Sequence, residues 1–215
     1  MKLNQYSSIF WDFGGVITSS PFEAFKKFEI ENNLPENFLR KVNSTNPQNN
    51  AWALLEQSKI NQMEFNDLFF QESSKLGFGV NGLKVLDLLE GDLRLGMVAI
   101  IKTLKKMDFI QACLTNNFIP DNDNQPDMMD FNKKAEVFSL FDFIFESKEI
   151  GLRKPDQAFY DYVLEEVGIP PEKIIFLDDL GINLKPAKAL GMTTIKVVSE
   201  FQAKEDLERI LKVKF

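Results

Sequence analysis

The chain has 215 residues and 44% of them are hydrophobic, enough for an α/β domain with a sizeable insertion and a buried core. Its formal net charge of −7 argues against nucleic acid as the main partner, because phosphate backbones need a basic surface. It contains no histidine and a single cysteine, Cys113. This excludes Ser-His-Asp and Cys-His catalysis, an intramolecular disulfide, and zinc sites built on histidine or several cysteines.

The first expected element is a buried strand, residues 8–12, that ends in a carboxylate. Its sequence is mostly apolar up to Asp12, and two glycines, Gly14 and Gly15, follow in the next loop. Glycine allows a sharp turn because it adopts positive φ without steric cost. A carboxylate at such a strand tip is where parallel α/β proteins place their chemistry. Taken alone, an Asp here more often only caps the next helix.

Residues 18–91 have helical patterns and no strand pattern. Ser20-Pro21-Phe22-Glu23 is a helix start, and Asn61 with Glu64 predicts a capping box. Helices are expected from residue 21 to a stop at 32–35, over 36–42, over 51–57, and from 61 to a stop at 77. The phenylalanines of these helices favour a hydrophobic core over a ligand pocket; they are Phe22, Phe25, Phe28, Phe65 and Phe69.

Strands and helices alternate after Gly91. The expected elements are a helix at 95–107, a strand at 109–114, an apolar run at 141–145, a helix at 156–167, a strand at 174–177, a helix at 182–190, a strand at 193–198 and a helix at 202–211. Residues 119–130 are expected to form a polar, disordered loop. Continuous apolar strands between helices indicate a parallel sheet covered on both faces. We therefore predict the α/β class: a doubly wound, Rossmann-like core of residues 1–17 and 92–215 with an inserted helical cap of residues 18–91.

Polar residues follow several of the expected strands. They are Asp12, Thr115-Asn116, Lys154 and Asp178-Asp179. Parallel strands bring their carboxyl ends to one edge of the sheet, so these side chains can converge. Each has an ordinary explanation by itself, as a strand-end hydroxyl, a solvated charge or a helix cap, but the set in this order makes those explanations improbable.

Two adjacent acids at the end of a buried strand are costly unless a cation neutralises them. Asp12 together with Asp178 or Asp179 would offer the hard oxygen ligands that suit Mg²⁺. Because the chain has no histidine, oxygen ligands are also what a metal must use here.

The order of these motifs resembles the haloacid dehalogenase (HAD) superfamily, whose members use an aspartate nucleophile, most often for phosphoryl transfer. The matching stretches are Phe10-Trp11-Asp12-Phe13-Gly14-Gly15-Val16, Leu114-Thr115-Asn116, Arg153-Lys154-Pro155-Asp156 and Phe176-Leu177-Asp178-Asp179. The stretch from Phe176 to Ala187 is especially similar to the N-terminal phosphatase domain of soluble epoxide hydrolases.

This resemblance implies a Mg²⁺-dependent hydrolase of a small phosphorylated metabolite. Asp12 would be the nucleophile and would give an aspartyl-phosphate, and Lys154 would stabilise the developing charge. The metal would be held by Asp12, the Gly14 carbonyl and Asp179, with Asp178 in support. Thr115 and the main-chain amide of Asn116 would bind the phosphoryl oxygens.

One departure from the family pattern leaves more than one type of reaction possible for this chain. Most phosphatases of this superfamily carry a second Asp, a general acid and base, two residues after the nucleophile, where this chain has Gly14. General acid–base catalysis contributes about 10²–10⁴ in rate, so ester hydrolysis should be weakened. The alternatives are a phosphate-compound binding or regulatory protein without turnover, or a hydrolase of another bond type, such as a dehalogenase or a phosphonatase-like enzyme. A phosphonatase needs a Schiff-base lysine, for which Lys26 and Lys27 are weak candidates.

Other classes fit less well. A phosphoacceptor receiver domain also uses Asp, Mg²⁺, Thr and Lys, but places its paired acids on the first strand. The N-terminus lacks the apolar run of a signal peptide, and no segment approaches the roughly 20 apolar residues that span a bilayer. We therefore expect a cytoplasmic protein without a membrane partner, and no pattern indicates an oligomeric state.

Overall fold

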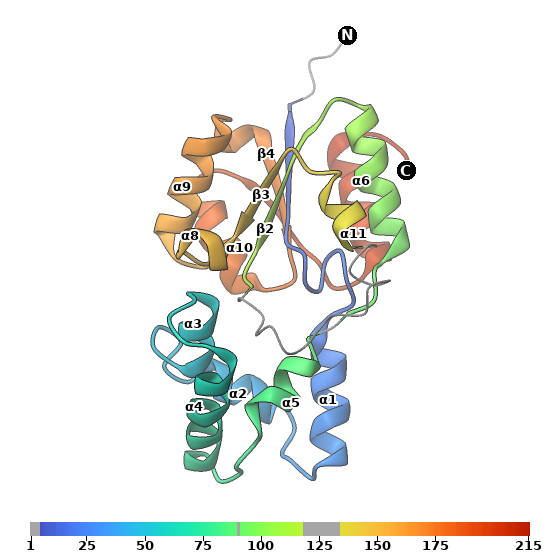
Figure 1. The fold of residues 1–215 in the computed structure, drawn as a ribbon. Helices are drawn as coiled ribbons and strands as arrows, with labels where there is room; N and C mark the ends of the chain where they lie inside the picture. Colours follow the sequence, from blue (N-terminus) through green and yellow to red (C-terminus); the bar gives the residue numbers. More distant parts are fainter. Residues whose placement is uncertain (1–4, 90, 118–133) are drawn as a thin grey trace.

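The computed structural model describes residues 5–89, 91–117 and 134–215. The loop expected at 119–130 lies outside these ranges. The described chain consists of an α/β core that contains a parallel sheet, and of a group of helices packed below it in Figure 1.

Five strands form the sheet within the described residues, in the order β3-β2-β1-β4-β5, and every neighbouring pair is parallel. Their bounds are Ser8–Trp11 for β1, Ile110–Thr115 for β2, Phe143–Glu146 for β3, Ile174–Asp178 for β4 and Thr193–Lys196 for β5. Trp11 at the end of the central strand is level with Cys113 of β2 and Leu177 of β4. The residues that follow these strands therefore meet at one edge.

Helices cover both faces of the sheet (Figure 1), which confirms the doubly wound α/β fold. Trp11 faces α6 (Leu95–Lys106) and α11 (Glu200–Leu211), whereas its neighbour Phe10 faces α9 (Gln157–Val167) and α10 (Gly181–Ala189). Successive side chains of a strand point to opposite faces, and both residues are fully buried because helices cover both faces. The short helix α8 (Ser147–Ile150) and a 3-10 turn (Pro171–Lys173) complete the named elements of this part.

The remaining helices form what we call the cap. They are α1 (Pro21–Glu31), α2 (Phe38–Ser44), α3 (Ala51–Glu56), α4 (Gln62–Lys75) and α5 (Gly82–Asp87). They enclose a hydrophobic cluster of their own that includes Phe25, Phe65 and Phe69, as the sequence predicted, while Phe22 and Phe28 are only partly buried. The predicted capping box of α4 is present, with Asn61 and Glu64 as its members.

Two paired segments connect the cap to the core. Thr18 forms an antiparallel bridge with Leu93, and the Arg94 N–H donates to the Ile17 carbonyl over 2.8 Å. The chain thus leaves and re-enters the core at one place, close to the predicted boundaries at 17/18 and 91/92. Those boundaries as domain limits stay a prediction.

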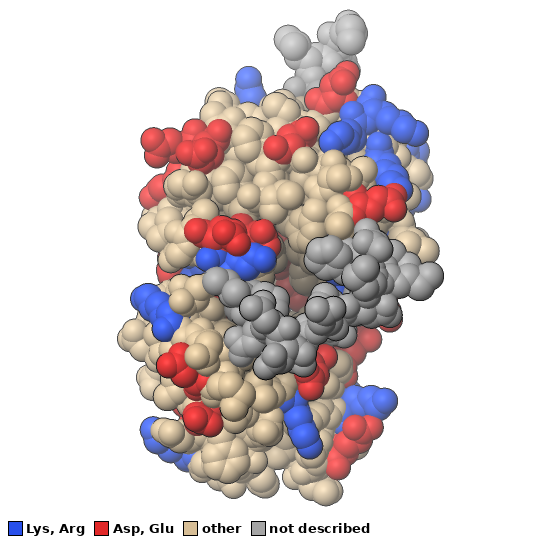
Figure 2. Space-filling view, in the orientation of Figure 1, with Lys and Arg blue, Asp and Glu red and all other residues tan. Residues whose placement is uncertain are grey.

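Charged side chains of both signs lie on the face shown in Figure 2, with basic ones gathered over α6. No helix in the described ranges is long and apolar enough to cross a membrane.

Candidate active site

Asp12 directly follows β1 and lies at the edge where the strands end. Its N–H donates to the Leu177 carbonyl over 2.8 Å, so the ladder with β4 extends to this residue and places it beside Asp178. The carboxylate is largely buried, and its Oδ1 accepts a 2.7 Å hydrogen bond from the Phe13 N–H. The same oxygen lies 2.9 Å from Lys154 Nζ. The backbone therefore fixes the orientation of the predicted nucleophile.

Lys154 is the most deeply buried cation of this edge, with a side chain that is 1% exposed. Its Nζ lies between Asp12 and the Asp178 Oδ2, at 2.9 and 2.8 Å. Burial alone would lower the pKa of Lys154, but the two carboxylates raise it, so the ammonium stays charged.

Asp178 is fully buried and its oxygens are already engaged. Oδ1 accepts from the Leu180 N–H at 2.8 Å, and Asn183 Nδ2 lies 3.1 Å from both oxygens. With Lys154 bound to Oδ2 as well, Asp178 is fixed in place and in turn orients the lysine. The supporting role in metal binding that the family resemblance implied for Asp178 stays a prediction.

Asp12, Asp178 and Asp179 form an acidic cluster whose ligand oxygens lie within 4.8 Å of one another. Burial, reinforced by the charges of Asp178 and Asp179, raises the pKa of Asp12 well above its usual range, although Lys154 opposes this. Burial and the Asp178 charge likewise raise the pKa of Asp179 to about 6. With all three ionised, one ammonium leaves two negative charges in the cluster. An all-oxygen donor set with this excess fits a divalent cation such as Mg²⁺.

The two glycines after Asp12 have different environments. Gly15 has φ +73°, and a Cβ there would lie 2.3 Å from the Asp179 Oδ2, so the carboxylate packs against the glycine backbone. Its carbonyl accepts a 2.8 Å hydrogen bond from Arg94, which holds the turn. Gly14 is not in the left-handed region, and no atom of the described residues lies within 4 Å of where its Cβ would be. The sharp turn predicted from the glycine pair therefore depends on Gly15.

The predicted phosphate-binding residues follow β2. Thr115 is its last residue and is largely buried. The side chain of Asn116 holds the main chain of Lys154 at two points: Oδ1 accepts from its N–H at 3.0 Å, and Nδ2 donates to its carbonyl at 2.9 Å. Any contact of Asn116 with a phosphate thus falls to its main-chain amide.

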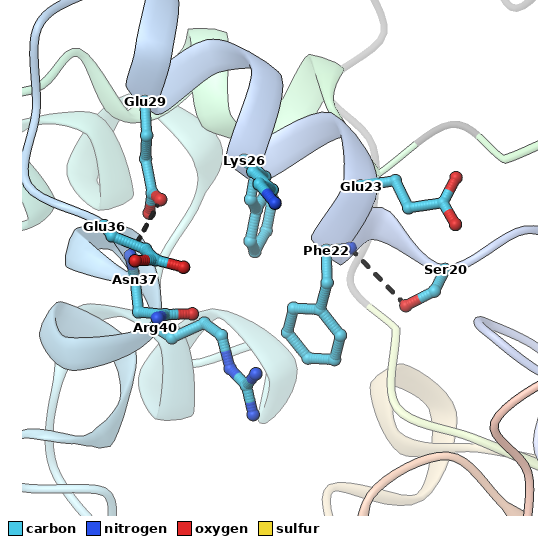
Figure 3. Close-up of a pocket in the computed structure, with 9 residues that line it drawn as sticks. Ser20, Phe22, Glu23, Lys26, Glu29, Glu36, Asn37 and Arg40 are labelled. Carbon is cyan, nitrogen blue, oxygen red and sulfur yellow. Dashed lines mark hydrogen bonds between the residues drawn. The ribbon is translucent and has the colours of Figure 1, made fainter.

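A cavity of about 320 Å³ lies between α1 and α2 of the cap (Figure 3). It is lined by Ser20, Phe22, Glu23, Phe25, Lys26, Glu29, Glu36, Asn37 and Arg40. The Ser20 hydroxyl lies 3.5 Å from the Asp179 Oδ2, so one end of the cavity adjoins the acidic cluster. The Arg40 guanidinium lies over the Phe22 ring, 4.4 Å from its centroid.

Sequence reasoning missed the roles of Ser20, Asn183 and Glu56. Ser20 was expected only to cap α1, and it does accept from the Phe22 N–H, but it also reaches Asp179. Asn183 could have been found from its place in the first turn of the helix after Asp178-Asp179, where it faces back to the strand end. No local signal distinguishes Glu56, the last residue of α3, because its partners in the core, Asn116 and Arg153, lie in distant parts of the chain.

Comparisons with known proteins agree with the fold and with the motifs. Residues 6–191 match the family model described as haloacid dehalogenase-like hydrolase. Bifunctional epoxide hydrolase 2 of Mus musculus is 28% identical over 216 residues, covering 95% of this chain but only 39% of that protein. A sesquiterpene phosphatase of Aspergillus oryzae is 28% identical over 166 residues, covering 75% of this chain and 79% of that one. A HAD family enzyme of Bacteroides thetaiotaomicron, crystallised with magnesium and inorganic phosphate, has a TM-score of 0.57 at 20% identity and covers 88% of this chain and 93% of its own.

Proposed function

Because the chain belongs to the haloacid dehalogenase-like hydrolases, we propose that it is a Mg²⁺-dependent phosphomonoesterase of a small phosphorylated metabolite. The observation that carries this proposal is the position of Asp12, between the Lys154 ammonium at 2.9 Å and the carboxylates of the acidic cluster. An anionic nucleophile beside a buried cation suits attack on a phosphoryl group. The phosphatase among the relatives supports the same reaction class.

In the first step, an Asp12 carboxylate oxygen attacks phosphorus. The new O–P bond forms as the ester P–O bond breaks, and the electron pair leaves with the alkoxide of the substrate. Lys154, fixed against Asp12 by Asp178, stabilises the charge on the phosphoryl oxygens, which Thr115 and the Asn116 amide help to bind. Mg²⁺ held by Asp12, Asp179 and the Gly14 carbonyl would shield the phosphate charge from the attacking carboxylate.

In the second step, water attacks phosphorus and the bond to Asp12 breaks, which restores the carboxylate and releases phosphate. No carboxyl stands at position 14 to protonate the leaving alkoxide or to activate this water. The alkoxide must take its proton from solvent, so we expect slow turnover for esters with basic leaving groups.

The cavity between α1 and α2 is the space that we assign to the leaving group of the substrate. At about 320 Å³ it is at the lower end of the roughly 300–1,000 Å³ of ligand pockets, and it adjoins Asp179 through Ser20. A leaving group of a few carbon atoms fits this space.

Gly14 keeps a second candidate open, a protein of the same fold that binds phosphate compounds without turnover. A hydrolase of another bond type is the further alternative. For a phosphonatase, Lys26 at least lines the cavity, but its side chain is exposed to water, whereas a Schiff-base lysine is activated in a desolvated pocket.

The test is hydrolysis of a panel of small phosphomonoesters with and without Mg²⁺, with Asp12→Asn as the control. Mg²⁺-dependent release of phosphate by the wild type and none by the variant would support the proposal. Binding of phosphate esters without release would favour the binding protein, and inactivity towards phosphates with cleavage of a haloacid would favour the dehalogenase.

A further inference from the structure

Glu56 is a buried carboxylate of the cap that contacts the core. It ends α3, is 8% exposed, and its Oε1 accepts a 2.9 Å hydrogen bond from Trp52 of the same helix. Its other oxygen, Oε2, forms an ion pair with Arg153 and lies 3.3 Å from the Asn116 Nδ2. Both of these partners belong to the core.

The two core partners of Glu56 both adjoin the main chain of Lys154. Arg153 is its neighbour in the chain, and Asn116 holds its N–H and its carbonyl. Glu56 therefore contacts the supports of Lys154 on both sides, although it does not contact the lysine itself in any hydrogen bond or ion pair of the described residues. The Lys154 ammonium in turn contacts Asp12.

This arrangement requires the cap and core to be in contact. The Arg153 side chain is 14% exposed, and its Nε has no hydrogen-bond partner among the described atoms. Two cap residues bind its other nitrogens: Glu56 binds Nη2, and the Pro47 carbonyl accepts from Nη1 at 3.4 Å. A buried guanidinium without its carboxylate is costly, so removal of Glu56 should displace Arg153 and the segment that carries Lys154.

We propose that Glu56 is a positioning residue that acts through Asn116 and Arg153 to hold Lys154 against Asp12. The cap thereby takes part in assembling the charged centre as well as in enclosing the substrate. The consequence for catalysis rests on the proposed phosphatase function, whereas the placement of Lys154 does not depend on it.

The first measurement needs no turnover. Acetylation of native protein, mapped by mass spectrometry, compares the labelling rate of Lys154 in the wild type, Glu56→Gln and Ser58→Ala. Ser58 is a matched control because its hydroxyl also crosses from cap to core, to the Lys148 carbonyl at 3.4 Å, but away from Asn116 and Arg153. We expect Lys154 labelling to rise several-fold in Glu56→Gln and to stay unchanged in Ser58→Ala. Equal labelling in all three proteins would overturn the proposal.

The second measurement separates positioning from other roles. For Glu56→Gln we expect kcat to fall by about 10-fold or more on both an aryl and an alkyl phosphate, with little change in KM, because misplacement by about 1 Å can cost 10²-fold. Ser58→Ala should retain its rates. A loss confined to the alkyl ester would make Glu56 a proton donor and would contradict a positioning role.

Two further outcomes are covered by these experiments. If the wild type hydrolyses no phosphate ester, the proposed function fails, and the labelling of Lys154 still decides the role of Glu56. If Glu56→Gln does not fold, Arg153→Gln removes the same ion pair from the core side, and the same rise in Lys154 labelling is expected. Unchanged labelling in that variant would refute the proposal.

Discussion

The Asp179 carboxylate packs directly against Gly15, and a Cβ at position 15 would lie 2.3 Å from its Oδ2. The φ of +73° at Gly15 would also strain any other residue there. Steric space and backbone conformation thus both require glycine at this position. The position of Asp179 in the acidic cluster depends on that missing side chain.

We expect Gly15→Ala to displace Asp179 and to destabilise the fold by about 1–3 kcal/mol, the cost of a strained backbone position. Stabilisation of the protein by Mg²⁺ should decrease as well. Gly14→Ala is the matched control, because its Cβ would meet no atom within 4 Å in the described parts of the chain and the backbone there is not left-handed. Thermal melts with and without Mg²⁺ measure both effects. Equal melts for the two variants would contradict the close packing of Asp179.

Asp12→Asn should abolish hydrolysis while the protein still folds. The amide keeps an oxygen for the Phe13 N–H and Lys154, but it lacks the attacking charge. Loss of a nucleophile typically lowers kcat by more than about 10³-fold. Because burial raises the pKa of Asp12 in the native protein, loss of its charge should leave the metal-free protein at least as stable. Phosphate release near the wild-type rate would show that another group is the nucleophile.

The acidic cluster predicts how stability depends on pH. Asp179 has a pKa of about 6 in the folded protein against an ordinary value of 3.8, so between these values the folded state binds more protons than the unfolded state. Stability without metal should therefore fall as pH rises from about 4 to about 7. Asp12 is shifted in the same direction, so Asp179→Asn should reduce this slope without removing it.

Chemical denaturation in EDTA at several pH values tests this dependence, with the change in midpoint as the readout. Added Mg²⁺ should stabilise the wild type more at pH 7.5 than at pH 5.5, because a metal binds the ionised carboxylates. A midpoint in EDTA that rises over the same pH interval would contradict the raised pKa of Asp179.

The acidic edge was predictable because parallel strands bring their carboxyl ends to one edge of the sheet. In the register that the structure shows, Trp11 pairs with Leu177, and Asp12 therefore lies beside Asp178. The ends of the helices were predicted less accurately than their presence. The helix α2 begins at Phe38, two residues later than expected, because Asn37 adopts a left-handed φ of 60°. The contact of Glu56 with Asn116 joins residues 60 positions apart across the junction of cap and core, and helical periodicity holds no information about such a contact.

The absent general acid leads to the last prediction, that Gly14→Asp increases hydrolysis. Among the described residues Gly14 has room for a side chain, and its backbone is one that other residues adopt, so the substitution should not strain the loop, and Gly15 still provides the turn. An Asp there stands two residues after Asp12, where related phosphatases hold their proton donor.

The gain from Gly14→Asp should depend on the leaving group. General acid catalysis contributes about 10²–10⁴ in rate, and an alkyl alkoxide needs a proton more than a phenolate does. We therefore expect a larger increase in kcat for an alkyl phosphate than for an aryl phosphate, with Gly14→Asn as the control that adds a side chain of the same shape without the acid. Equal gains from Asp and Asn would point to an effect of shape. A folded, Mg²⁺-binding Gly14→Asp protein with no gain on either ester would show that proton transfer does not limit the rate of hydrolysis. A binding protein without turnover, or a hydrolase of another bond type, would then be favoured.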